Sequence, residues 1–163
     1  MLQWYKDEEL EIYFSDIPCT KMVTILPSMS KEEKQLCKKK PFINLRQLYI
    51  TILDKRGEEP VEYRFGIERG YRWDGASIPP LFWILIGSKT DPRYQIPSMI
   101  HDKMCENHAY VGNDRELSTL VFDKCLIVSD VWHVYRNVMK NSVNFYQRFC
   151  KWKKPKQGSG LNA

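Results

Sequence analysis

The sequence lacks two features that would direct it into or across a membrane. No run of apolar residues approaches the ~20 that a membrane-spanning helix needs. The first ten residues, MLQWYKDEEL, carry acidic side chains where a secretory signal peptide has a basic start and an apolar core. We therefore expect no membrane span and no signal peptide, and a protein that works in the cytosol or is delivered by another route.

Paired cysteines are absent as well. The chain has five cysteines, an odd number at wide spacing, and no C-x-x-C pair. They are Cys19, Cys37, Cys105, Cys125 and Cys150. This pattern predicts reduced thiols in a reducing compartment.

A nucleic-acid-binding motif is also missing, although the formal net charge is +5. The lysines gather at segment ends: Lys38 to Lys40 follow a predicted helix, and four more lie between residues 151 and 156. Lysines at a helix C-terminus complement the helix dipole and help to keep a small protein soluble. Since no aromatic-interleaved RNA-binding motif accompanies them, nucleic acid is not an expected partner.

What is present is the composition of one ordered domain. The chain has 163 residues, of which 43% are hydrophobic and 13% aromatic. A domain of this size buries roughly 70% of the surface that its unfolded chain exposes. No internal repeat or linker divides the chain, so we expect a single domain over residues 1–150 and a flexible basic tail at 151–163.

Strand-forming runs dominate the first half. Residues 2–26 hold two short apolar runs that suit two strands, or one strand and an irregular arm. The segment QLYITILDKRGEEPVEYRFGI alternates apolar and polar residues on both sides of KRGEE, which predicts a hairpin, and residues 71–73 can return as a third strand. Between these regions, Ser30 and Glu33 form a capping box for a short polar helix over residues 30–40, expected as a surface insertion.

The second half has helical spacing. IPSMIHDKMCENH predicts one helix, RELSTLVFDKCLIV predicts a second capped by Asn113, and a third begins at Ser129 or Asp130. Strands followed by helices predict an α+β domain: a small antiparallel β-meander followed by three C-terminal helices packed on it.

Candidate functional residues lie where the strands give way to the helices. The turn DGASIPP brings Asp74 and Ser77 next to the helix that carries His101 and Asp102. Neighbours on a helix are about 100° apart, so His101 and Asp102 can face one cleft. With Asp74 they form a candidate catalytic set, or the roughly three ligands that a hydrolytic divalent metal takes. Ser77 is a further candidate nucleophile, although GASIP lacks the G-x-S-x-G pattern.

Two other interpretations concern the same residues. Asp74 can accept hydrogen bonds from the amides of residues 76 and 77 in an Asx turn, with His101 as its structural partner. His101, Cys105 and His108 share one helix face, but the two histidines would be about 10 Å apart along a straight helix. One ion cannot bind both, so the sequence favours a packed Cys105 thiol and an exposed His108.

The motif DGASIPPLFW, followed by IHDKMC and then by RELSTLVFDKCL, resembles the DUF1353 family of phage and prophage proteins. In that family a strand ends in a T-D-G-A-S-I-P type turn and a helix opens with H-D-x-x-Y. The resemblance covers about residues 60–145. Cys105 stands at the family's tyrosine, and Ser118 and Thr119 stand where an Ala-Asp pair is usual, so an additional acidic metal ligand is missing. The resemblance implies a phage or mobile-element origin more strongly than it implies a reaction.

Two functions stay open. The first is a small metal-dependent or His/Asp hydrolase with a cleft between sheet and helices, in which His101 is the general base or a metal ligand. The second is a non-enzymatic phage protein, associated with the virion or tail or with a host factor, in which the same residues fasten the turn to the helix. The resemblance implies the cytoplasm of a bacterial host or the phage virion, with other phage structural proteins as partners.

Overall fold

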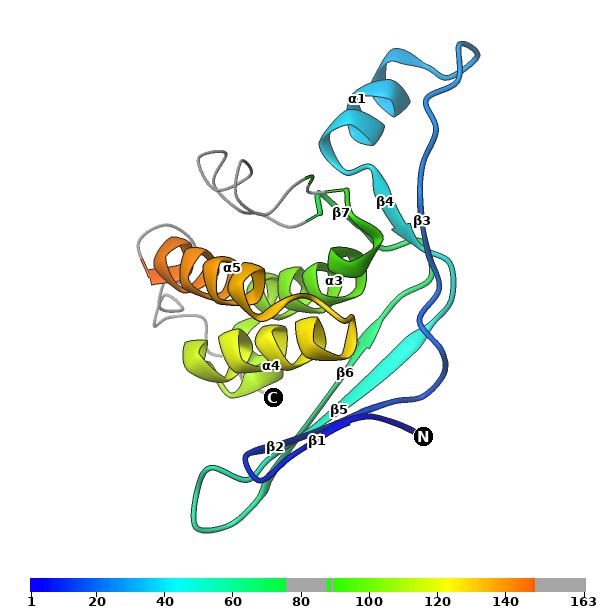
Figure 1. Ribbon diagram of the computed structural model, residues 1–163. Helices are drawn as coiled ribbons and strands as arrows, with labels where there is room; N and C mark the ends of the chain where they lie inside the picture. Colours follow the sequence, from blue (N-terminus) through cyan, green and yellow to red (C-terminus); the bar gives the residue numbers. More distant parts are fainter. Residues whose placement is uncertain (76–87, 89, 149–163) are drawn as a thin grey trace, which may run out of the picture.

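The computed structural model describes residues 1–75, 88 and 90–148. In these residues it has seven strands in two antiparallel sheets, followed by helices (Figure 1). The α+β class is therefore confirmed. The predicted tail at 151–163 lies outside the described residues.

The larger sheet has four strands in the order β1-β2-β5-β6. Its strands are β1 (Leu2–Lys6), β2 (Leu10–Phe14), β5 (Leu48–Asp54) and β6 (Val61–Ile67). Ile52 lies opposite Ile12 on β2, and Ile50 lies between Phe14 and Phe65 on its two neighbours. Because alternate residues face the same side of a strand, these side chains form one apolar face. The predicted β5–β6 hairpin is confirmed.

The smaller sheet joins β3 (Thr20–Met22), β4 (Phe42–Asn44) and β7 (Arg72–Trp73) in the order β3-β4-β7. We predicted that residues 71–73 would continue the meander next to β6, but β7 pairs with β4, with Trp73 opposite Phe42. Gly70, at φ +90°, turns the chain after β6, and its amide donates to the Asn44 carbonyl at 2.8 Å. The Asn44 amide in turn donates to the Tyr71 carbonyl at 2.9 Å, so this turn diverts the third strand into the second sheet.

Helix α1 (Lys31–Lys39) has the predicted capping box. The Ser30 side chain accepts from the Glu33 amide, and the Glu33 side chain accepts from the Ser30 amide. Figure 1 shows α1 at the far end of an arm that it forms with β3 and β4, well away from α4. Residues 2–26 contain three strands, one more than the two expected.

The remaining helices are α3 (Pro92–Glu106), the 3-10 helix η1 (His108–Val111), α4 (Arg115–Val128) and α5 (His133–Tyr146). Two predicted starts were wrong. Asp114, and not Asn113, caps α4, because Asn113 takes a left-handed φ of 61° while the Asp114 side chain accepts from two backbone amides. Helix α5 starts at His133 because Asp130, at φ 55°, reverses the chain after α4.

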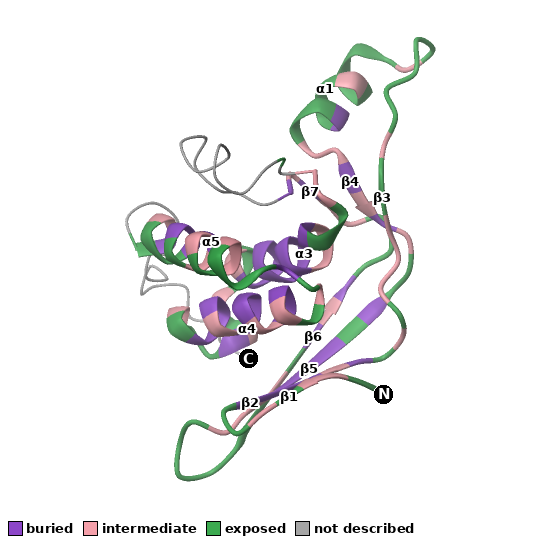
Figure 2. Cartoon of the chain, viewed as in Figure 1, coloured by how far each residue is buried: buried purple, intermediate pink, exposed green. Residues whose placement is uncertain are grey.

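Helices α3 and α4 cover the apolar face of the larger sheet. Met99, Ile100 and Met104 of α3 have no exposed surface and join the core with Leu117 and Val121 of α4. A second cluster packs α5 against them, with Tyr94, Phe122 and Met139 buried at its centre. Figure 2 shows buried residues concentrated in α3, α4 and β5. No helix in the described part of the chain is both long and apolar enough to cross a membrane.

Candidate functional site

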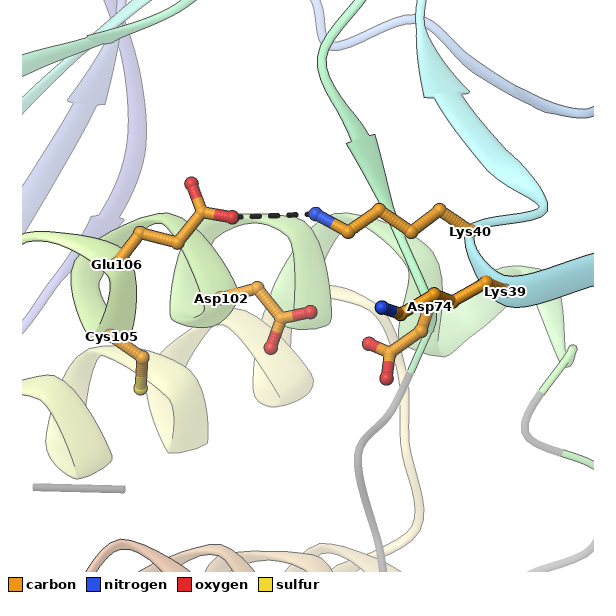
Figure 3. Close-up of a pocket in the computed structure, with 6 residues that line it drawn as sticks. All are labelled: Lys39, Lys40, Asp74, Asp102, Cys105 and Glu106. Atoms are coloured by element: carbon orange, nitrogen blue, oxygen red, sulfur yellow. Dashed lines mark ion pairs between the residues drawn. The ribbon is translucent and has the colours of Figure 1, made fainter. Parts of the chain in front are cut away.

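A pocket of about 280 Å³ lies where the end of β7 and the end of α1 meet one face of α3 (Figure 3). We call it the seam pocket. It is lined by Lys39, Lys40, Asp74, Asp102, Cys105 and Glu106.

Helix α3 contributes three of these side chains through its spacing. Asp102, Cys105 and Glu106 stand at positions i, i+3 and i+4, which lie on one face of a helix. Ile100 and Met104, on the other face, are buried in the core. Figure 3 shows the Asp102 carboxylate pointing from α3 toward the side of the pocket where Asp74 lies.

The end of β7 is held against α3 by Trp73. Its indole Nε1 donates to Ser98 Oγ at 3.2 Å, and its ring stacks on Phe42 with centroids 5.6 Å apart. Asp74 follows directly and is half-buried at the pocket wall. The packing of Trp73 therefore positions the backbone of Asp74 at the pocket.

The arm that carries α1 forms the facing wall. Lys39 and Lys40 follow one another at the C-terminal end of α1, and Lys40 Nζ lies 3.6 Å from Glu106 Oε1. This ion pair connects α1 to α3 across the pocket. The lining thus combines three carboxylates, two ammonium groups and a thiol.

The Tyr71 side chain lies close to the same carboxylates. Burial is the main cause that raises the pKa of its hydroxyl, and the nearby negative charges of Glu106 and Asp102 raise it further. The phenol therefore stays neutral at physiological pH and adds no charge beside the pocket.

His101 lies behind the pocket lining and is only 7% exposed. Its Nε2 is 2.7 Å from the amide nitrogen of Gln147, which follows α5 and is itself 1% exposed. With the Gln147 amide nitrogen as the donor, Nε2 is the acceptor and the ring hydrogen is assigned to Nδ1. His101 Nδ1 is 3.9 Å from Asp102 Oδ1.

Gln147 makes further hydrogen bonds in this buried network. Its amide nitrogen also donates to Ser118 Oγ at 2.8 Å, and its oxygen accepts from Thr119 Oγ1 at 2.9 Å. Both partners belong to α4. The network therefore connects α3, α4 and the end of α5 through buried polar groups.

Cys105 links the network to the pocket. Its Sγ lies 3.6 Å from His101 Nε2 and 3.9 Å from Nδ1, and Gln147 Nε2 is 3.4 Å from it, beyond its two shorter hydrogen bonds to His101 and Ser118. We predicted a packed thiol, but Cys105 is partly exposed and lines the pocket. Its i, i+4 spacing from His101 was a sequence signal for this contact, whereas nothing in the sequence pointed to Gln147.

The structure brings together some of the predicted site residues. Asp74 and Asp102 line one pocket, while His101 sits one layer behind them. Ser77 and the amides proposed for the Asx turn lie outside the described residues. His108 belongs to η1, beyond the end of α3, so it does not continue the predicted stripe of His101 and Cys105.

A metal ion was a further hypothesis for Asp74, His101 and Asp102. Over residues 1–75, 88 and 90–148, no three His, Cys, Asp or Glu side chains are placed to hold one metal ion. That range includes Asp74, His101 and Asp102. Although Asp102 and Asp74 share the pocket, His101 points into the network with Gln147.

Comparison with known proteins agrees with the motif. A family model described as "Protein of unknown function (DUF1353)" matches residues 54–143, slightly more than half of the chain. The chain therefore belongs to the DUF1353 family.

A curated relative carries no described activity either. Over 69 residues the chain is 35% identical to "Uncharacterized protein y4jT" of Sinorhizobium fredii (strain NBRC 101917 / NGR234). The aligned part is 42% of this chain and 20% of that protein, so the chain spans about one fifth of the relative that it matches. No solved structure matches.

Proposed function

We propose that this DUF1353 chain is a small hydrolase-type domain that acts in the seam pocket. The observation that carries the proposal is that Asp74 and Asp102, from the strand half and the helix half of the fold, line the same pocket with two lysines. Its volume of about 280 Å³ lies just below the range for small-molecule sites, which is about 300–1,000 Å³. A small substrate is therefore expected.

The pocket groups suit hydrolysis of a polar carbonyl compound. A carboxylate such as Asp102 can accept a proton from an attacking group. The ammonium groups of Lys39 and Lys40 can stabilise the negative charge that develops on the carbonyl oxygen. His101 Nδ1 lies beside this carboxylate, 3.9 Å from Asp102 Oδ1, which is longer than a hydrogen bond.

The proposal assigns this chemistry to the side chains themselves. No step of it is assigned to a metal ion. Lys40 is partly neutralised by Glu106 at 3.6 Å. Lys39 is therefore the better candidate to stabilise an oxyanion.

A second candidate is a non-enzymatic phage protein, bound to the virion or tail or to a host factor. The burial of His101 at 7% and Asp102 at 9% favours it, as does the hydrogen bond from Gln147 to the imidazole. In that case the polar cluster holds β7, α3 and α5 together and has no substrate. Other phage structural proteins are then the expected partners.

The two candidates differ in what Asp102→Asn and Asp74→Asn do. With p-nitrophenyl acetate as the probe, the hydrolase proposal expects each variant to lower kcat/KM about tenfold or more, which is within the usual contribution of a general base. Asp16→Asn, the same change at a half-exposed carboxylate paired with Arg46 away from the pocket, should leave kcat/KM unchanged. Wild-type protein with no turnover above buffer, or Asn variants as active as wild type, would refute the hydrolase proposal.

A further inference from the structure

The seam pocket contains a thiol whose surroundings differ from those of the other described cysteines. We propose that Cys105 is the nucleophile of this pocket and that it forms a thioester with the acyl group of a small ester or thioester substrate. This inference rests on the proposed function and deepens it, because it names the attacking atom and the substrate class.

The geometry of Cys105 and His101 carries the inference. The two residues are one helical turn apart on α3, and Sγ lies 3.6 Å from Nε2. Thiols and hydroxyls that act as nucleophiles are activated by a neighbouring base, and a third group holds that base in place. Gln147, at 2.7 Å from Nε2, orients the imidazole, although it does so through the nitrogen nearest to the sulfur.

Access distinguishes Cys105 from the buried cysteines. Cys37 and Cys125 are 3% and 0% exposed, and burial raises the pKa of Cys125 to about 12, which keeps that thiol protonated. Cys105 is partly exposed and lines a pocket that could admit a substrate. Cys19 has intermediate exposure as well and lies outside the pocket lining, so it is a matched control within the same chain.

The two lysines of the pocket offset part of the negative charge around the sulfur. The carboxylates of Asp74, Asp102 and Glu106 oppose a thiolate, whereas Lys40 pairs with Glu106 at 3.6 Å and Lys39 adds a second positive charge. Gln147 Nε2 lies 3.4 Å from Sγ, so this amide can turn an N–H toward the sulfur and donate a hydrogen bond to the thiolate. The thiolate is the reactive form of cysteine.

The reaction has two halves. The Gln147 amide hydrogen first turns away from His101 Nε2 toward Sγ. Cys105 then transfers its thiol proton to the freed Nε2, and the thiolate attacks the carbonyl carbon of the substrate. The bond from this carbon to the leaving oxygen or sulfur breaks, the leaving group takes the proton from His101, and the acyl group remains on Sγ. Water then attacks the thioester and gives a proton to His101. The C–S bond breaks, the acid leaves, and the thiolate regains its proton.

Alkylation of the reduced, native, full-length protein with iodoacetamide tests the thiol directly. Peptide mass spectrometry gives the rate at each cysteine separately. Cys105 should react about tenfold or more faster than Cys19, because the rate follows the thiolate fraction and access. A Cys105 rate no higher than that of Cys19 overturns the inference, and this comparison needs no variant.

The base is tested with His101→Ala in the same assay. The alkylation rate of Cys105 should fall to about that of Cys19, while the alkylation rate of Cys19 should stay unchanged. A purely structural role of His101 would not produce this selective loss. If His101→Ala does not fold, Gln147→Ala replaces it and should lower the Cys105 rate in the same sense. An unchanged Cys105 rate in a folded variant overturns the role of His101.

Acyl transfer is tested with p-nitrophenyl acetate. Intact and peptide masses of wild-type protein should show one acetyl group on Cys105, and Cys105→Ala should lose both this adduct and the turnover. If Cys105→Ala keeps the turnover while Asp102→Asn loses it, the hydrolase proposal stands and the thioester inference fails. If wild-type protein neither turns over nor is acetylated, both fail.

Discussion

The two faces of α3 differ in what holds them in place. Met99, Ile100 and Met104 on one face have no exposed surface and pack against the larger sheet. Asp102 and Cys105 on the other face meet polar partners from α1, β7 and the end of α5. The apolar face needs only burial, which is non-directional, whereas the polar face depends on particular atoms at particular distances. The same helix therefore supports the fold with one side and presents reactive groups with the other.

The largest effect is expected on the apolar face. Ile100→Ala should lower the free energy of unfolding by about 2–5 kcal/mol, because the removed methyl groups leave a cavity in a packed core. Urea unfolding followed by tryptophan fluorescence measures this. Leu36→Ala on α1, where the side chain is 45% exposed, is the control and should change the free energy by less than about 0.5 kcal/mol. Equal losses at both positions would contradict the assigned core.

A smaller loss is expected behind the polar face. Gln147→Ala removes the partner of His101 Nε2, Ser118 Oγ and Thr119 Oγ1. Leaving buried polar groups unpaired should cost about 1–3 kcal/mol in the same unfolding experiment. Asn141→Ala, at an exposed position of α5, is the control for loss of an amide side chain. If the two variants are equally stable, the buried network does not contribute to the fold.

The smallest effect is expected at a polar contact on the rim of the larger sheet. Burial of Asp7 opposes its ionisation, but hydrogen bonds from Lys124 and Tyr5 outweigh this and lower the pKa of Asp7 from 3.8 to about 2. The folded state therefore favours the ionised form of Asp7 more strongly than the unfolded state does. The stabilisation is complete above about pH 4 and is lost as the pH falls through the folded pKa near 2.

Asp7→Asn should therefore cost about 1–2 kcal/mol at pH 7, less than the full pKa shift implies because the pair is partly hydrated. The variant should also show a shallower loss of stability between pH 4 and pH 2 than wild type, measured by thermal unfolding across that range. Asp16→Asn, at a side chain that is 50% exposed, is the control. If Asp7→Asn loses stability between pH 4 and pH 2 as steeply as wild type does, other carboxylates cause that loss.

Much of the fold could be predicted because its signals are local. The alternation in β5 and β6 predicted the hairpin, and Ser30 with Glu33 predicted the start of α1. Local signals failed where two residues compete for one role: Asn113 and Asp114 can each cap a helix. The left-handed backbone of Asn113 decided between them. The pairing of β7 with β4 could not be predicted either, because it depends on a turn whose hydrogen bonds come from Asn44, far away in the sequence.

The candidate site was predicted in outline only. Asp74 and Asp102 were expected to share a cleft and do line one pocket, but His101 was expected in the same cleft and is buried behind it. Lys39 and Lys40 had been interpreted as solubilising charges at a helix end. They reach the pocket because the arm of β3 and β4 returns α1 to α3, an arrangement that no local pattern encodes.

By itself, the sequence determined the α+β class, the membership of the DUF1353 family and the polar residues on one side of α3. These follow from side-chain periodicity and from motifs read along the chain. Only the tertiary structure decided that β7 joins the smaller sheet and that Gln147 reaches His101 across 46 residues. Such contacts depend on how whole strands and helices pack, because directional hydrogen bonds form only after burial has brought distant segments together.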